Sequence, residues 1–359
     1  MKVLFVYKFL TVGGVETVLR ARLDALPAHG IDGHAWFFHD LGGRSVFRGC
    51  EERIRVGAPA QLAADLAGSS YDLVTTFDSP ELFTDLALPA GLSVVVECHS
   101  PYVENLGYLG DLRSPPVVEI WVPTDFQRGV VAARCRVPLP IEVLPNPIRQ
   151  AFLDPVRPFP APPSRPVVAW VGRMDELKNW RGFLELGREL LARGFPGELW
   201  MAGKPVEPAV AGEIRRLASE QGILPRLRWF RELPHEHLPA WIDAVRDSGG
   251  VVVSTSRGDA FGMTVAEAMA RQCAVAAPAM GPFPEFVTDG ETGLLLTPDK
   301  PADAAKRLLE LLADGPRRAR LGANARALIG ERYAPEGSAK ALVARLRALA
   351  ATPAGTPSA

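Results

Sequence analysis

Short apolar runs alternate with longer amphipathic stretches along most of the chain. Runs rich in Val, Leu, Ile and Phe are typical of buried strands, and the stretches between them have the periodicity of helices that cover a sheet. Repeated strand and helix units predict an α/β protein built on parallel sheets. In the first half, the predicted strands are residues 2–8, 34–40, 72–77, 92–99, 119–124 and 141–146, and the clearest helices are residues 15–26 and 80–88.

The alternation is interrupted near the middle of the chain and then resumes. Residues 145–166, PNPIRQAFLDPVRPFPAPPSRP, contain too many prolines for a helix or a central strand, so they predict a semi-rigid connector. We therefore expect two domains, residues 1–150 and residues 151–332. In the second, strands are predicted at residues 166–172, 198–203, 227–233, 250–256, 273–279 and 292–298, and helices at residues 181–192, 206–221, 238–246 and 264–270.

The last part of the chain is predicted to be helical. Helices are expected at residues 303–313, 316–329 and 336–350. We expect residues 333–350 to return to the first domain as a terminal helix. Residues 351–359, ATPAGTPSA, are of low complexity and predict a disordered tail.

Composition and charge narrow the class of protein. The 359 residues carry a formal net charge of -1 without a long run of one sign, which disfavours binding to nucleic acid. No run reaches the roughly 18 apolar residues of a membrane span, and no basic amphipathic helix supports peripheral membrane contact. The first ten residues are too short for a signal segment, and the 4 cysteines lack CxxC spacing. We expect a cytoplasmic protein with reduced thiols.

A metal site is not expected from the histidines of LPHEHLPAW. His235 and His237 are two residues apart at a polar helix start, and the sequence shows no third ligand near them. Both side chains are therefore expected to face solvent.

Two acidic residues flank a predicted strand-to-helix turn in SRGDAFGMTVAEAMA, residues 256–270. We expect Thr264 to open the helix, with free N–H groups at Met263, Thr264 and Val265 that favour phosphate together with the helix dipole. Gly262 would let the backbone approach a ligand closely.

The acidic side chains of this turn allow two interpretations. Glu267 lies three residues after Thr264, so it could form a capping box with the Thr264 N–H and have no further role. However, DAFGMTVAEAMA resembles the acidic-x7-Glu motif of the retaining glycosyltransferases of family 4, which have the GT-B fold of two Rossmann-like domains facing each other across a cleft. The resemblance implies that Asp259 contacts the donor sugar and Glu267 the ribose. The family normally has glutamate first, and the shorter Asp259 departs from that pattern.

A second segment of the resemblance is VAWVGRMDELKNWRGF, in which Arg173 and Lys178 follow a strand that ends at Gly172. The matching cations of the family hold the diphosphate. Fixed cations there would stabilise the charge that a leaving nucleoside diphosphate gains. An ordinary surface ion pair is the alternative.

The first domain contributes two weaker matches. Gly13 and Gly14, in FLTVGGVETVLRARL, resemble the family's GGxE loop, and an ordinary strand-to-helix turn is the alternative. The pattern is not G-x-G-x-x-G, which disfavours a nicotinamide enzyme. His99, in SVVVECHSPY, matches a histidine that reaches the donor sugar in the family, although a histidine satisfied in the core is equally open.

The resemblance implies a retaining glycosyltransferase with an N-terminal acceptor domain and a C-terminal nucleotide-sugar domain. The donor would be a nucleoside diphosphate sugar, with UDP favoured over GDP, and the acceptor a hydroxyl of a glycan or small-molecule natural product, without a metal or other cofactor. Two alternatives remain: a GT-B epimerase or hydrolase acting on the nucleotide sugar, and a non-catalytic nucleotide-sugar binding protein. The implied catalytic residues are Asp259, His99, Arg173 and Lys178, and the implied donor-binding residues are Gly13, Gly14, Arg173, Lys178, Arg231, Gly262, Met263, Thr264 and Glu267.

Overall fold

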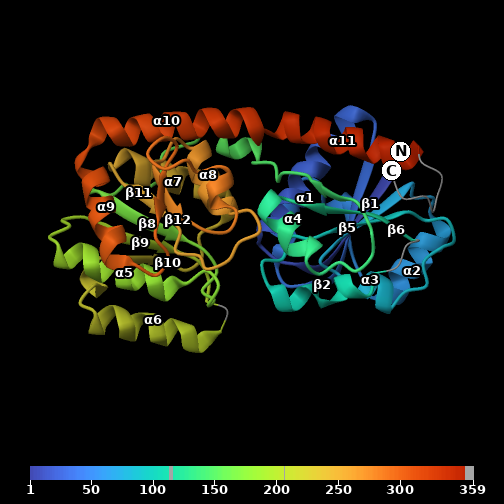
Figure 1. The fold of residues 1–359 in the computed structure, drawn as a ribbon, viewed down its shortest axis with the longest axis horizontal. Coiled ribbons are helices and arrows are strands. Elements are labelled where there is room, and N and C mark those ends of the chain that lie inside the picture. Colours follow the sequence, from blue (N-terminus) through green and yellow to red (C-terminus); the bar gives the residue numbers. More distant parts are fainter. Residues whose placement is uncertain (113–115, 206, 352–359) are drawn as a thin grey trace. The chain divides into compact units, whose positions relative to one another are not determined.

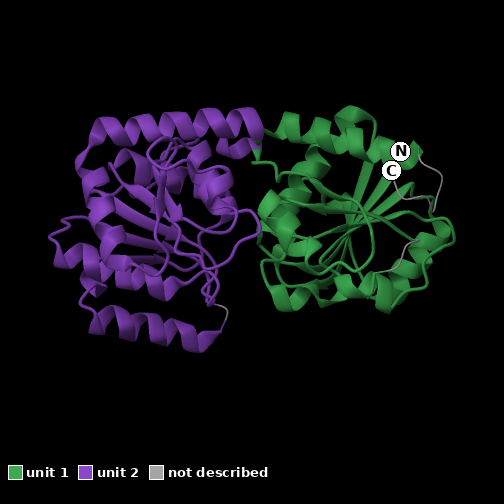
Figure 2. Ribbon diagram, viewed as in Figure 1, with its two compact units in different colours: residues 1–149, 333–359 green, residues 150–332 purple. Residues whose placement is uncertain are grey.

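The computed structural model describes residues 1–112, 116–205 and 207–351. The chain divides into two compact units: residues 1–149 with 333–359 form unit 1, and residues 150–332 form unit 2 (Figure 2). Apart from Ala351, the tail that we predicted to be disordered lies outside the described residues. No helix among the described residues is long and apolar enough to cross a bilayer.

Unit 1 is built on a seven-stranded parallel sheet in the order β3-β2-β1-β4-β5-β6-β7. Its inner strands are rich in β-branched and aromatic residues and are largely buried on both faces, as expected when helices cover a parallel sheet. The strand order reverses beside β1, which is where open parallel sheets hold ligands. The strands are β1 Lys2–Leu10, β2 Asp32–Asp40, β3 Ile54–Val56, β4 Leu73–Phe77, β5 Val94–Glu97, β6 Val117–Val122 and β7 Ile141–Val143.

The helices of unit 1 differ in part from the prediction. The segment predicted to be helical at residues 80–88 forms only one turn, Glu81–Thr84. Two helices, α2 and α4, were not predicted, and α4 begins where the Thr124 side chain accepts a hydrogen bond from Gln127 N at 3.1 Å. The last helix, α11, packs against α1 (Figure 1). The helices are α1 Gly14–Ala25, α2 Pro59–Gly68, α3 Glu81–Thr84, α4 Asp125–Ala132 and α11 Pro335–Ala351.

Unit 2 has a six-stranded parallel sheet in the order β10-β9-β8-β11-β12-β13. In the view of Figure 1, α5 and α6 lie below this sheet and α8 and α10 above it. The strands are β8 Val167–Val171, β9 Glu198–Ala202, β10 Leu227–Phe230, β11 Val251–Val253, β12 Val275–Pro278 and β13 Leu294–Leu296. The helices are α5 Trp180–Ala192, α6 Pro208–Glu220, α7 Leu238–Asp247, α8 Met263–Ala270, α9 Pro301–Ala313 and α10 Gly315–Arg332.

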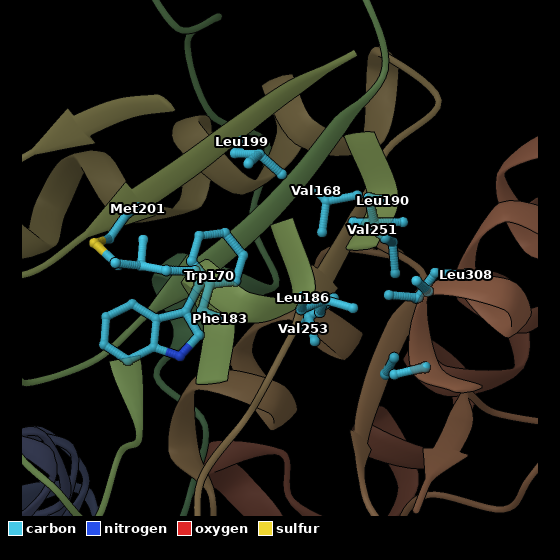
Figure 3. Packing of buried hydrophobic residues seen from close by; sticks show 14 of the residues in the cluster. Val168, Trp170, Phe183, Leu186, Leu190, Leu199, Met201, Val251, Val253 and Leu308 are labelled. Carbon is cyan, nitrogen blue, oxygen red and sulfur yellow. The ribbon is translucent and has the colours of Figure 1, made fainter. Parts of the chain in front are cut away.

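The core of unit 2 fixes the loops at one edge of its sheet. Alternate residues of β8, Val168 and Trp170, are buried in one apolar cluster, in which Trp170 packs against Phe183 of α5 with ring centroids 6.2 Å apart (Figure 3). Burying each such side chain contributes about 1.5–3 kcal/mol. Trp170 also donates a hydrogen bond from Nε1 to Thr255 Oγ1 at 3.0 Å, so the core directly holds the loop that follows β11.

Candidate functional site

Two predicted site residues meet at the carboxyl edge of the sheet in unit 2. Lys178 follows β8 and Asp259 follows β11, and these two strands are neighbours in the sheet. Lys178 Nζ lies 2.6 Å from Asp259 Oδ2, with side chains that are 22% and 14% exposed. The two loops therefore bring a cation and an acid together at one partly open position.

The turn after β8 directs the lysine toward this position. Asp175 accepts hydrogen bonds from the Lys178 backbone N at 2.8 Å and from Arg173 Nε at 2.9 Å. Asn179 has a left-handed backbone with φ of 54° and caps α5 by accepting from Gly182 N at 3.1 Å. Arg173 extends further into solvent, with its side chain 55% exposed. Asp175 and Asn179 were not predicted as site residues, although Asp and Asn are frequent in turns and at helix starts.

Hydrogen bonds tie the loop after β11 to the turn after β8. Thr255 Oγ1 donates to the carbonyl of Asn179 at 2.8 Å, and Ser256 Oγ donates to the carbonyl of Leu177 at 3.2 Å. The backbone N of Arg257 donates to the same Leu177 carbonyl at 2.7 Å. Asp259 and Lys178 thus belong to one hydrogen-bonded assembly rather than to two independent loops.

The helix after this loop starts one residue earlier than predicted. Gly262 is the N-cap, with φ of 93°, and Met263 is the first residue of α8. The prediction of three free amides is wrong for Val265, whose N–H donates to the Gly262 carbonyl at 3.0 Å. The N–H groups of Met263 and Thr264 have no partner among the described residues. A helix start with two such amides and the positive end of the dipole favours an anion.

Glu267 does not form the capping box that its spacing allowed. The N-cap is Gly262, without a side-chain cap, so Glu267 lies in the second turn of α8 and is buried. Its Oε1 is 3.5 Å from His235 Nε2. The expectation that His235 faces solvent is therefore wrong, because its side chain is 18% exposed and its ring packs at 5.6 Å on Phe152. His237 is exposed, as expected.

Arg231 follows β10 at the same edge of the sheet. Its guanidinium lies 5.3 Å from the centre of the Trp229 ring, and Trp229 Nε1 donates to the Gly203 carbonyl at 3.0 Å. Stacking on the indole holds the cation at the rim of unit 2. A contact between Arg231 and a nucleotide base stays a prediction.

In unit 1, the paired glycines start the first helix, as the sequence predicted. Gly13 is the N-cap of α1 and Gly14 its first residue. The Glu16 carboxylate closes this loop by accepting from the backbone N of Thr11 at 2.6 Å. A Cβ on Gly13 would lie 2.9 Å from Glu16 Oε2, so a larger residue would require the Glu16 carboxylate to shift. Glu16, which was not predicted as a site residue, shapes the glycine loop.

His99 lies beside a buried ion pair at the end of β5. Its Nε2 is 3.3 Å from Glu97 Oε2, and Arg22 Nη1 donates to the two Glu97 oxygens at 2.6 and 2.8 Å. Burial alone would raise the pKa of Glu97, but the Arg22 charge lowers it below its ordinary value. Burial lowers the pKa of His99, which outweighs the opposite effect of Glu97. His99 is therefore held neutral and oriented by its neighbours.

Asp78 is a further buried acid beside His99 that the sequence did not reveal. Its Oδ2 accepts from the His99 backbone N at 2.9 Å, and its own backbone is left-handed, with φ of 41°. Its Oδ1 is buried without a hydrogen-bond partner among the described residues. Burial raises the pKa of Asp78 to about 7, although hydrogen bonds from the backbone of His99 and Ser100 act in the other direction.

No cluster of three or more His, Cys, Asp or Glu residues suited to a metal occurs in the described part of the chain.

Sequence comparisons match the C-terminal half of the chain. Residues 156–328 match the family model of glycosyl transferases group 1. D-inositol 3-phosphate glycosyltransferase of Corynebacterium efficiens is 35% identical over 162 residues, which cover 44% of this chain and 37% of that protein. Alpha-D-kanosaminyltransferase of Streptomyces kanamyceticus is 28% identical over 171 residues, covering 47% and 42%. The chain thus matches well under two thirds of the length of these relatives.

Solved structures match nearly the whole chain. Anabaena Alr3699/HepE in complex with UDP and glucose has a TM-score of 0.79 at 18% identity, covering 97% of this chain and 100% of that one. Sucrose-phosphate synthase from Thermosynechococcus elongatus has a TM-score of 0.75 at 18% identity, covering 97% and 99%. These similarities confirm the GT-B fold with two Rossmann-like domains. The match of residues 156–328 shows that this part of the chain is similar to glycosyl transferases group 1.

Proposed function

We propose that this chain is a retaining glycosyltransferase of the family 4 type, which transfers a sugar from a UDP-sugar to a hydroxyl group of a glycan or small-molecule acceptor. The observation that carries the proposal is the Lys178–Asp259 pair at the carboxyl edge of the unit 2 sheet. Lys178 lies in the turn between β8 and α5, and Asp259 in the loop that leads from β11 to α8. The matched segment, residues 156–328, contains this pair and Glu267. In the proposal, unit 2 binds the donor and unit 1 the acceptor.

The diphosphate is assigned to Lys178, Arg173 and the amides of Met263 and Thr264. Lys178 is the less exposed cation and is directed by Asp175, so little reorganisation is needed when a phosphate arrives. Preorganised cations and amides stabilise the negative charge that develops on the leaving UDP. Gly262 supports this contact because its left-handed backbone turns the chain into α8.

The two acids are assigned to the two sugars of the donor. Glu267 accepts hydrogen bonds from the ribose. Asp259 contacts the transferred sugar once a phosphate of the donor also binds Lys178 and so weakens the Lys178–Asp259 pair. From unit 1, His99 and the backbone of Gly13 and Gly14 are assigned to the transferred sugar. Because Glu97 occupies Nε2 of His99, a sugar hydroxyl would donate to Nδ1.

Retention follows from a front-face route in this proposal. Asp259 is paired with Lys178 and Glu267 lies against His235, so these carboxylates are not arranged as a nucleophile and an acid for double displacement. The bond between the anomeric carbon and the phosphate oxygen breaks, with its electron pair going to the phosphate. The acceptor oxygen forms its bond on the same face, and its proton moves to that phosphate oxygen.

The choice of UDP is supported by the bound ligands of a structural relative. The Anabaena Alr3699/HepE structures contain UDP or UDP-glucose. The Trp229 and Arg231 side chains offer a flat, cationic rim suited to a base, but this rim does not separate uracil from guanine.

The proposal is tested by the stereochemistry of turnover. The full chain is incubated with UDP-glucose, UDP-galactose and UDP-N-acetylglucosamine plus simple alcohol acceptors, and the first anomer formed is read by proton NMR. Formation of the α anomer from an α-linked donor is expected. Initial formation of the β anomer would contradict retention, and UDP binding without turnover of any donor would favour the non-catalytic alternative.

A further inference from the structure

The carboxylate assigned to the ribose has a histidine partner from another part of unit 2. His235 belongs to the short 3-10 turn His235–His237 that precedes α7, and Glu267 belongs to α8. Their nearest atoms, His235 Nε2 and Glu267 Oε1, are 3.5 Å apart. A carboxylate can only accept a hydrogen bond, so this contact is favourable when the facing His235 nitrogen is the one that bears the N–H.

Glu267 needs such a partner because its side chain is only 5% exposed. An ionised carboxylate removed from water to this extent is costly unless nearby groups compensate its charge. Its second oxygen, Oε2, has no hydrogen-bond partner among the described residues. One oxygen is thus held by the protein, and the other is available to a hydroxyl donor.

The ring of Phe152 and the backbone around it hold His235 in place. Its ring meets the ring of Phe152 in a T-shaped contact at 5.6 Å, and Phe152 is fully buried. The carbonyl of Phe152 accepts a hydrogen bond from Arg271 at 3.3 Å, and the carbonyl of Leu153 accepts one from Arg326 at 2.8 Å. Because Arg271 follows α8 directly, the start of the connector is fastened to the helix that carries Glu267.

We propose that His235 is a positioning residue for donor binding: it holds Oε1 of Glu267 so that Oε2 is presented to a ribose hydroxyl of the nucleotide. This inference rests on the proposed function, which assigns Glu267 to the ribose. In this inference His235 acts on the nucleotide through Glu267, so its contribution to nucleotide binding depends on both the carboxylate and the hydroxyl.

A double-mutant cycle tests this dependence. The full chain is titrated by calorimetry with UDP, GDP and their 2′-deoxy and 3′-deoxy forms, as wild type, His235→Ala, Glu267→Ala and the double variant. We expect His235→Ala to weaken binding of the ribonucleotide about five- to tenfold, which lies within the range found for directly coupled side chains. In the Glu267→Ala background, and with the deoxynucleotide that lacks the bound hydroxyl, His235→Ala should cause no further loss.

Two variants complete the test. His237→Ala removes an exposed imidazole two residues away and should leave binding unchanged, whereas His235→Gln retains an N–H donor and should recover part of the affinity. The inference would be overturned if His235→Ala reduced ribonucleotide affinity equally in the wild-type and Glu267→Ala backgrounds, or did not reduce it at all. Either result would leave the proposed function intact. Failure of the wild-type protein to bind UDP or GDP would overturn both. Thermal unfolding of each variant separates these outcomes from misfolding.

Discussion

Lys178 Nζ lies 2.6 Å from Asp259 Oδ2, although the two residues are 81 positions apart in the chain. In the structure, each group compensates the charge of the other at a partly exposed position. A diphosphate that binds Lys178 must therefore compete with Asp259 or share the lysine with it. This competition leads to the first prediction.

Replacing Asp259 should separate catalysis from nucleotide binding. Asp259→Ala frees Lys178, so we expect the Kd for UDP to stay the same or to fall. Turnover should fall about 100-fold or more, because the variant loses an electrostatic contact to the reacting sugar. Asp259→Glu, which restores the residue usual in the family, should retain or raise kcat. A large loss of UDP affinity in Asp259→Ala would contradict this assignment.

Gly262→Ala should destabilise the protein and weaken donor binding together. The residue has φ of 93°, and a Cβ would lie 2.6 Å from the Phe283 ring. A strained left-handed residue costs about 1–3 kcal/mol. Gly330→Ala is the matched control, because Gly330 lies inside α10 with nothing within 4 Å of the added Cβ. Gly330→Ala should raise the free energy of unfolding by about 0.5–1 kcal/mol, as measured by urea titration.

Asp78→Asn should change the pH dependence of stability. The pKa of Asp78 is raised from 3.8 to about 7, so between these values the folded state binds more protons than the unfolded state. Wild-type stability is therefore lost as pH rises through this interval, by up to about 1.4 kcal/mol per pH unit from this group. The free energy of unfolding of Asp78→Asn minus that of the wild type should grow from pH 4 to pH 7 and then level off. A difference that does not vary with pH would show that Asp78 is ionised throughout.

Removing Arg22 should expose the cost of a buried, unpaired acid. The Arg22 and Glu97 side chains are 3% and 0% exposed, so Arg22→Met leaves a desolvated carboxylate without its cation. The expected loss is about 3–5 kcal/mol by chemical denaturation. Arg22→Met combined with Glu97→Gln should recover part of this loss. A loss below about 1 kcal/mol, the value typical of surface pairs, would mean that water reaches Glu97 in solution.

Strand and helix alternation made much of the fold predictable from sequence. The buried strands of both sheets are continuous apolar runs, and α5, α7, α9 and α10 lie close to their predicted positions because each buries one apolar face. The helix predicted at residues 80–88 is wrong beyond its first turn, although the apolar periodicity continues up to Pro89. Local signals therefore located most elements and were weakest at their ends.

Candidate site residues could be predicted only where a motif lies within one continuous segment. Arg173, Lys178, Asp259 and Glu267 were predicted in this way, and their roles stay predictions. The Lys178–Asp259 pair, the His235–Glu267 contact and the hydrogen bond from the His99 backbone to Asp78 each join segments far apart in sequence. Such contacts depend on which strands are neighbours in the sheet, and no local spacing in a single sequence records that.

The measurement that tests the central claim most directly is thermal unfolding of the wild type, Lys178→Ala and Lys306→Ala with UDP, GDP, ADP, TDP and NAD. A ligand that binds only the folded state adds about 2.7 kcal/mol at a hundred times its Kd. We predict a rise in Tm with UDP for the wild type and for Lys306→Ala, which changes an exposed lysine of α9, and no rise for Lys178→Ala. No rise with any nucleoside diphosphate, or an equal rise in Lys178→Ala, would contradict the account.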